Sequence, residues 1–303
     1  MYEFRFEGFS REQCNEYLVR INAADFDGQL TPENLDMLIS RHQKSVPFEN
    51  LALSEGWGSI DMDADALFRK IVTDRRGGFC FELNGAFLLL LRGLGYDAAG
   101  CMARVGLPFI GELLKLDHHG VIVRIEGKSY YCDVGMGGPK ADWAVEFDPT
   151  VNTAYTDAAD ANINADADTN VNTNADVETN ANKSDSAEIK KQTRHGQTYW
   201  IEDTYEGWKM LKNAGSESDG SVIIFNPVRM LPMDFAANCK DLVQRGNTIF
   251  HKERMVNICR ENNGYVDIRN NILKESDGIN VTQREYSEEE FTRILKEYFG
   301  III

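Results

Sequence analysis

The sequence lacks the cysteine patterns that hold a structural metal ion or a disulfide framework. Its six cysteines are scattered along the chain, with no C-x-x-C pair and no Cys/His cluster at metal-ligand spacing. We therefore expect no bound metal and free thiols in a reducing compartment, most of them acting as small buried hydrophobes.

Long apolar runs and an excess of positive charge are also missing. The run Phe87 to Leu91 is far too short to span a bilayer, and the N-terminal stretch MYEFRFEGFSREQ contains no apolar segment of signal length. Asp and Glu outnumber Lys and Arg by 48 to 32, giving a net charge of −16, whereas nucleic acids and anionic membranes attract basic faces. The sequence thus predicts a cytoplasmic protein that binds neither nucleic acid nor membrane.

Helical periodicity dominates the chain up to Leu94. Ser10 to Gln13 reads as a capping box, Thr31-Pro32 opens a second helix, and an apolar helix runs from Cys80 to Arg92. With 303 residues and 43% hydrophobic content, the chain can bury one large core or several smaller ones. We expect this first part to form a small helical bundle.

Strand patterns begin at Tyr96. Two strand segments, 119–125 and 128–134, are joined by a tight turn at Glu126-Gly127 and predict a hairpin. The chain ends in a second capping box, Ser287 to Glu290, and an amphipathic helix that stops at Gly300. Helices, then strands, then a mixed end indicate an α+β fold.

The segment from Val151 to Glu188 interrupts the strand region. It is composed almost entirely of Asn, Asp, Ala and Thr, which cannot bury a core, so we expect it to be a disordered surface-loop insertion. A regulatory or partner-binding role is an alternative to a tolerated insertion.

Cys80 is the cysteine best placed for chemistry. It follows a Gly-Gly turn and opens an apolar helix, where the helix dipole favours an anion and lowers the pKa of a thiol. The predicted hairpin brings a histidine, His118 or His119, beside the carboxylate of Asp133. These residues could form a Cys-His-Asp triad, and the alternative is a buried cysteine with surface histidines.

Four ordered motifs resemble the arylamine N-acetyltransferase family. Arg76 to Asn84 (RGGFCFELN) is similar to its R-G-G-x-C-x-x-x-N signature, and Val46 to Leu51 (VPFENL) to its I-P-F-E-N-L segment. H-x-x-V-x-V begins at His118, and D-V-G-M-G-G begins at Asp133. The intervals also match the family, with 38 residues from Cys80 to His118 and 15 from His118 to Asp133.

This resemblance implies the family's fold and its chemistry. The fold would be a helical bundle at 1–94, a β-barrel at 95–215 that carries the insertion, and an α/β lid at 216–303, around a papain-like Cys-His-Asp core. Cys80 would take the acetyl group from acetyl-CoA, the co-substrate, and pass it to an arylamine or hydrazine in a ping-pong reaction. His118 would be the base, since His119 fits neither the interval nor the motif, and Asp133 would orient it.

The same motifs imply roles for the neighbouring residues. Glu49 and Arg76 would form a partly buried salt bridge that holds the cysteine loop, with Asn84 as further structural support. Phe48 and Met136 would line the acceptor pocket, where Met136 replaces the family's usual phenylalanine with a flexible thioether.

Glycines follow Asp133 and would serve the co-substrate. Gly135, Gly137 and Gly138 would allow the pyrophosphate of CoA to approach the backbone closely.

Other functions are compatible with the same residues. Pocket shape rather than the triad selects the acyl group, so transfer of malonyl, propionyl or another short acyl group is a close alternative. A thiol hydrolase or transglutaminase-like enzyme would need an open cleft for a peptide and access for water. A non-catalytic scaffold ranks last, because a protein without chemistry has no physical need for Cys80, His118 and Asp133 together.

Overall fold

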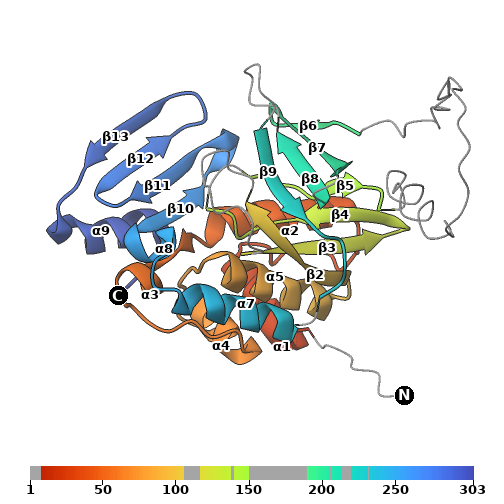
Figure 1. Cartoon of the computed structure of the whole chain (residues 1–303), viewed down its shortest axis with the longest axis horizontal. Helices are drawn as coiled ribbons and strands as arrows, with labels where there is room; N and C mark the ends of the chain where they lie inside the picture. Colours follow the sequence, from red (N-terminus) through yellow and green to blue (C-terminus); the bar gives the residue numbers. More distant parts are fainter. Residues whose placement is uncertain are drawn as a thin grey trace, which may run out of the picture.

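The computed structural model describes residues 8–105, 117–137, 140–149, 190–204, 207–212, 220–230 and 232–303. The predicted insertion at 151–188 and Gly138 lie outside these ranges. The fold is α+β, as the element order predicted, with a helical layer beneath two antiparallel sheets (Figure 1).

The first part of the chain is helical, as its periodicity predicted. Its elements are α1 (Arg11–Arg20), α2 (Pro32–Ser45), the short strand β1 (Phe48–Glu49), α3 (Leu51–Ser54), α4 (Ala64–Phe68), the π-helical turn η1 (Arg69–Thr73) and α5 (Cys80–Leu94). The Ser10 side chain and Gln13 form the expected capping box, and Thr31 caps α2. Gly95 ends α5 with a φ of 103°, a left-handed conformation that glycine adopts without strain.

Eight strands form the larger sheet, in the order β5-β4-β3-β2-β9-β8-β7-β6. They are β2 (Asp97–Val105), β3 (His118–Ile125), β4 (Lys128–Cys132), β5 (Val145–Phe147), β6 (Gln192–Arg194), β7 (Gln197–Thr204), β8 (Gly207–Lys212) and β9 (Gly220–Phe225). The β3–β4 hairpin turns at Glu126 and Gly127, both with positive φ. The Gln192 side chain bonds the backbone N–H and C=O of Glu146, so the two edge strands nearly close the sheet into a barrel. Apolar residues, among them Trp143, Tyr199 and Phe225, fill its interior.

A second, five-stranded sheet lies in the C-terminal part. Its elements are β10 (Met255–Cys259), the 3-10 turn η3 (Glu261–Asn263), β11 (Tyr265–Arg269), β12 (Ile272–Ser276), β13 (Val281–Glu285) and the covering helix α9 (Glu288–Phe299). The order is β1-β10-β11-β12-β13, so β1 from the helical region is an edge strand of this sheet. The capping box of α9 and its end at Gly300 are confirmed.

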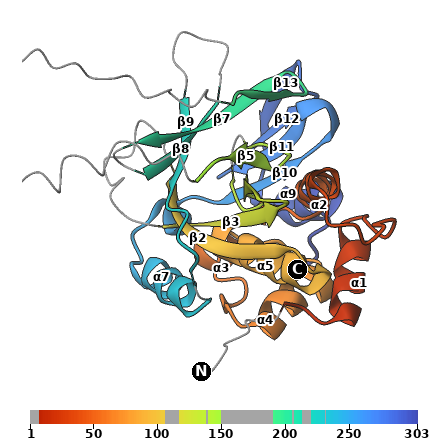
Figure 2. The same ribbon diagram turned by 90° about the vertical axis from the view of Figure 1, so that its right-hand side faces the viewer.

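Two further helices join the sheets. They are α7 (Pro232–Gln244) and α8 (Ile249–Lys252), and α7 lies beside α5 in the helical layer (Figures 1 and 2). The expected boundary between barrel and lid at residue 215 assigns β9 to the lid, whereas β9 pairs with β2 and β8 in the barrel sheet. The division of the chain into three domains stays a prediction. Among the described helices, none is both long and apolar enough to cross a membrane.

Candidate active site

Cys80 is the first residue of α5, at the point where the cysteine loop turns into the helix. The loop passes close to other backbone at Gly77, where an added Cβ would lie 2.0 Å from the carbonyl oxygen of Pro47, so only glycine fits there. Cys80 is buried, and its Sγ lies 3.7 Å from the carbonyl oxygen of Asp117. Cys80 therefore stands in the first turn of α5, the end of a helix at which the dipole favours an anion.

His118 opens β3, and its ring joins Cys80 to Asp133. Nε2 of His118 lies 2.6 Å from Oδ2 of Asp133, and the Cys80 thiol is a further hydrogen-bond partner of the ring. Since Asp133 occupies Nε2, Nδ1 remains for the thiol. The structure thus brings together the three residues that the sequence selected.

Asp133 is held on both carboxylate oxygens. Oδ1 accepts hydrogen bonds from Asn84 Nδ2 and from the backbone N–H of Gly135, each at 2.9 Å. Oδ2 accepts one from the Tyr131 hydroxyl at 3.2 Å in addition to that from His118. These contacts hold the carboxylate at the position from which it bonds the imidazole.

The charges at the site favour an ionised pair of His118 and Asp133. Burial disfavours the charged form of His118, but Asp133 and the Cys80 thiol outweigh it and raise the pKa of His118 well above its usual value. Burial acts to raise the pKa of Asp133, but His118 and the hydrogen bonds from Asn84 and Gly135 lower it. An imidazolium next to a cysteine is the electrostatic setting that favours a thiolate, and Asp133 stabilises that imidazolium.

His119 has a different environment from its neighbour. It is buried, it stacks on Phe235 with ring centroids 3.7 Å apart, and burial lowers its pKa to about 3. Successive residues of a strand point to opposite faces, which explains why His119 is turned away from Asp133. The expectation that His119 points away from the triad agrees with this geometry, whereas the alternative of surface histidines is wrong.

Asn84 and the pair Glu49–Arg76 support the loop and the triad. Arg76 Nη2 lies 2.8 Å from Glu49 Oε1, and the Glu49 side chain is fully buried. The other carboxylate oxygen accepts the N–H of Leu51 at 2.8 Å. Asn84 bonds the His119 carbonyl and Asp133, and its Oδ1 accepts the Val134 N–H at 2.9 Å.

The two described glycines of the D-V-G-M-G-G motif have different surroundings. An added Cβ at Gly135 would lie 2.8 Å from Cys80 Cα and 2.9 Å from the Cys80 carbonyl oxygen. At Gly137 it would lie 2.7 Å from the Phe48 ring. Gly135 therefore serves close packing beneath the cysteine, which the sequence motif alone did not predict.

A cavity of about 370 Å³ opens next to Gly137, between α2, the barrel and the second sheet. Its lining includes four cationic side chains and two carboxylates: Lys44, Lys140, Lys212, Arg269, Asp142 and Asp267. Lys140 is buried, with Nζ 2.8 Å from the Met136 carbonyl oxygen. In a chain with a net charge of −16, this lining is unusually rich in positive charge.

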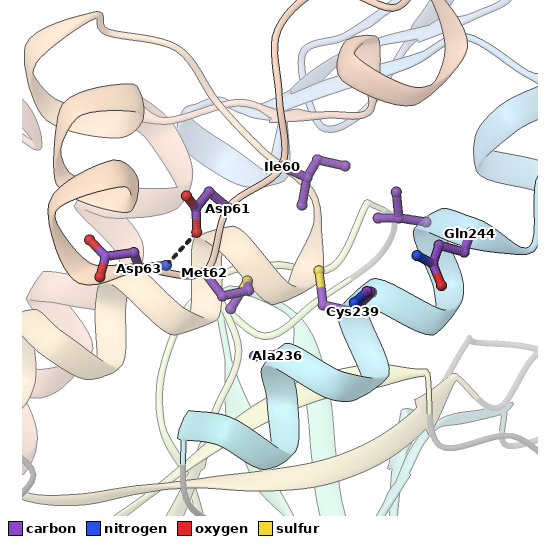
Figure 3. Close-up of a pocket in the computed structure, with 9 residues that line it drawn as sticks. Ile60, Asp61, Met62, Asp63, Ala236, Cys239 and Gln244 are labelled. Carbon is purple, nitrogen blue, oxygen red and sulfur yellow. Dashed lines mark hydrogen bonds between the residues drawn. The ribbon is translucent and has the colours of Figure 1, made fainter.

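A second cavity, of about 570 Å³, lies between α7 and the segment before α4. Figure 3 shows Met62 on one wall and Cys239 on the other. Neither Phe48 nor Met136 lines these two cavities, although both are buried. Their role in acceptor binding stays a prediction.

Sequence reasoning missed several residues around the triad. Tyr131 and Gln43, whose Nε2 lies 2.9 Å from the Asp133 carbonyl oxygen, carried no motif signal. Glu82, which forms an ion pair with Lys70, was also missed. Its position three residues after the N-cap of α5 is typical of a capping box, and this signal was available in the sequence. Within the described ranges, no group of three or more His, Cys, Asp or Glu residues is placed to hold a metal ion.

Comparison with known proteins gives concordant matches. The N-acetyltransferase family model matches residues 31–303. The arylamine N-acetyltransferase / N-hydroxyarylamine O-acetyltransferase of Salmonella typhimurium is 36% identical over 122 residues, which are 40% of this chain and 43% of that protein. The chain thus aligns with less than half the length of this curated relative.

Solved structures match over nearly the whole chain. The arylamine N-acetyltransferase from Salmonella typhimurium superposes with a TM-score of 0.77 at 20% identity, covering 97% of this chain and 92% of that one. The Mycobacterium marinum arylamine N-acetyltransferase in complex with CoA superposes with a TM-score of 0.73 at 20% identity, covering 95% of this chain and 92% of that one. Identities this low show the fold alone. Because the family model covers most of the sequence, this chain belongs to the arylamine N-acetyltransferase family.

Proposed function

We propose that this protein transfers the acetyl group of acetyl-CoA to the nitrogen of an arylamine or arylhydrazine through an acetyl-Cys80 intermediate. The observation that carries the proposal is the Cys80–His118–Asp133 arrangement, with a 2.6 Å contact between His118 and Asp133 and the thiol at the start of α5. Such a nucleophile, base and orienting carboxylate are the parts that covalent acyl transfer requires.

In the first half-reaction, the Cys80 thiolate, whose proton His118 holds, attacks the thioester carbonyl. A carbon–sulfur bond forms to Cys80, the bond to the CoA sulfur breaks, and His118 returns the proton to the departing thiolate. The products are acetyl-Cys80 and CoA. Asp133 stays ionised throughout and stabilises the imidazolium.

In the second half-reaction, the acceptor nitrogen attacks the carbonyl of acetyl-Cys80. His118 takes one proton from that nitrogen, the bond to the cysteine sulfur breaks, and the amide product forms. The Cys80 thiolate is regenerated next to the protonated His118, which is the state from which the next cycle begins. The acceptor can enter only after CoA has left, which makes the kinetics ping-pong.

The cationic cavity next to Gly137 is the place we propose for the phosphates of acetyl-CoA. Lys140, Lys212 and Arg269 lie in its wall and supply the charge that phosphate groups attract. Gly137 lines this cavity, which supports its expected role, whereas Gly135 is occupied by its contact with Cys80. Gly138 lies outside the described residues, and its role stays a prediction.

Intact-protein mass spectrometry tests the covalent step. Wild type incubated with acetyl-CoA and no acceptor should gain one acetyl group, and adding an arylamine or a hydrazine should remove it. Cys80→Ala should gain none, while Cys14→Ala, which changes a buried cysteine on α1, should behave as wild type.

The alternatives give different results in the same assay. If an adduct forms only with another short acyl-CoA, that thioester and not acetyl-CoA is the donor. Cleavage of peptide or amide substrates without an adduct would assign the triad to a thiol hydrolase. Acetylation that persists in Cys80→Ala would contradict the mechanism.

A further inference from the structure

The side chain of Gln43, on α2, joins two points of the barrel region that the chain itself connects only through a longer stretch. Its Nε2 donates to the carbonyl oxygens of Asp133 and Ala141, at 2.9 Å in each case. Gln43 is buried, with 1% exposed, and it also lines the cationic cavity. An amide nitrogen carries two hydrogens, so it can bond both carbonyls at once, and these bonds fix which end of the amide faces them.

The two carbonyls lie where the chain leaves the sheet and where it comes back. Among the described strands, the pairings of β4 end before Asp133, and β5 begins after Ala141. A buried backbone carbonyl outside a strand ladder needs a donor from elsewhere, because burying it without one is costly. Gln43 supplies that donor to both carbonyls and thereby closes the base of the 133–141 segment.

The 133–141 segment contributes to the wall of the cationic cavity through Gly137 and Lys140. Two cations of that cavity bond the backbone of the segment. Lys140 Nζ lies 2.8 Å from the carbonyl oxygen of Met136. Arg269 Nη2, from β11, lies 3.4 Å from that of Gly137. The positions of these two charges therefore depend on where the segment lies.

The carboxylate of the triad has anchors that do not involve Gln43. The side chain of Asp133 accepts hydrogen bonds from Asn84, from the Tyr131 hydroxyl and from the Gly135 N–H. Gln43 bonds only the backbone carbonyl of Asp133. Loss of the Gln43 amide should therefore loosen the segment while the carboxylate stays in place.

We infer that Gln43 is a positioning residue for acetyl-CoA, which clamps the base of the 133–141 segment and so keeps Lys140 and Arg269 at the spacing that the phosphate groups require. The inference rests on the proposed function, which places those phosphates in the cationic cavity. A loose segment lowers affinity, because it must be ordered each time the ligand binds. Removal of the clamp therefore weakens the binding of acetyl-CoA more than it slows the chemical step.

Gln43→Met tests the clamp, because methionine has a similar length but no N–H to donate. Mass spectrometry follows the rate of Cys80 acetylation at increasing concentrations of acetyl-CoA. The half-saturating concentration should rise about tenfold, while the limiting rate changes by less than about threefold. In Gln43→Glu a carboxylate would face the two carbonyl oxygens, so this second variant should raise the half-saturating concentration further.

A donor without phosphates separates the cavity from the triad. p-Nitrophenyl acetate can transfer its acetyl group to the Cys80 thiolate with release of p-nitrophenolate, and it carries no phosphate. Its rate of reaction should be the same in Gln43→Met as in the wild type. An equal fall with both donors would indicate damage to the triad and overturn the inference, as would an unchanged half-saturating concentration of acetyl-CoA.

Gln192→Met is the matched control. Gln192 is a second glutamine whose amide bonds the backbone, since its Nε2 lies 3.0 Å from the carbonyl oxygen of Glu146. It belongs to the edge strand β6 and is not among the residues that line the cationic cavity. This variant should leave the half-saturating concentration unchanged. Cooperative thermal unfolding checks that each variant is folded.

Titration calorimetry with CoA reads the cavity without the chemistry. The dissociation constant of CoA should rise about tenfold in Gln43→Met. If wild-type Cys80 takes no acetyl group from acetyl-CoA, but CoA binds and Gln43→Met weakens it, the proposed function is wrong and the clamp stands. If Cys80 is acetylated and Gln43→Met binds CoA as the wild type does, the proposed function stands and the clamp is wrong. A wild type that does not bind CoA overturns both.

Discussion

The contact between Gly135 and Cys80 gives the most specific prediction for activity. Replacing Gly135 with alanine places a Cβ 2.8 Å from Cys80 Cα, 2.9 Å from its carbonyl oxygen and 2.7 Å from Asn84 Nδ2. Non-bonded carbon atoms prefer separations of about 3.5–4.0 Å, so the two segments must part by roughly 0.7–1.2 Å. The obstacle is partly backbone, which cannot rotate away as a flexible side chain can.

This displacement acts on the triad itself. The Gly135 N–H bonds Asp133 Oδ1, so a shift of this segment away from α5 moves Asp133 and His118 relative to the sulfur. A misplacement of about 1 Å at a catalytic group costs on the order of 10²-fold in rate. Overpacking of this kind also destabilises the fold by about 1–3 kcal/mol.

Gly85→Ala is the matched control, because Gly85 lies on the same helix as Cys80. The nearest atom to its added Cβ is Met62 Cε at 3.2 Å, the end of a flexible side chain. We expect this variant to keep its activity and to gain up to about 1 kcal/mol, since alanine favours a helix interior over glycine.

The assay is the initial rate of CoA thiol release with a saturating arylamine, alongside urea unfolding followed by tryptophan fluorescence. Gly135→Ala should lose about 10²-fold in rate while still unfolding cooperatively. A Gly135→Ala rate within a few-fold of that of Gly85→Ala would refute the argument that this contact sets the position of the triad.

Two further predictions concern stability. Burial lowers the pKa of His119 to about 3, against about 6.5 in the unfolded chain. Between these two pH values the unfolded state binds one proton that the folded state does not. The free energy of unfolding therefore falls as the pH is lowered from about 6.5 towards 3. His119→Phe should remove up to about 5 kcal/mol of that fall, and an unchanged slope in urea unfolding would count against a buried neutral imidazole. Arg76→Met leaves the Glu49 carboxylate buried without its cation and should lower the free energy of unfolding by about 3–5 kcal/mol. The double variant Glu49→Gln/Arg76→Met should recover part of this loss. If the effects of the two substitutions simply add, the two side chains are not coupled.

Local signals predicted much of the secondary structure. The capping boxes at Ser10 and Ser287, the turn at Glu126-Gly127 and the start of α5 at Cys80 all form as their residue types require. These features depend on residues within a few positions of one another, which is why the sequence reveals them directly.

The barrel boundary is a case in which local signals were insufficient. β9 follows residue 215, yet it pairs with β2, more than a hundred positions earlier in the chain. Pairing across such a distance depends on which strand edges remain free once the sheet forms, and no local pattern carries that information. The roles of Phe48 and Met136 remain predictions for a similar reason, since a pocket is a property of many packed segments.

By itself, the sequence determined which residue types stand at the site, namely a cysteine at a helix start and a histidine and an aspartate on one hairpin. The distances between them, the assignment of His118 Nε2 to Asp133, and the contacts with Asp133 and Cys80 that raise the pKa of His118 against the effect of burial were decided by tertiary structure. Packing of α5 against β2 and β3 brings residues 38 and 53 positions from Cys80 to it, and the same packing excludes water. The Lys70–Glu82 pair and the contact of Gly135 with Cys80 exist for the same reason, because both arise only where separate segments are pressed together out of water.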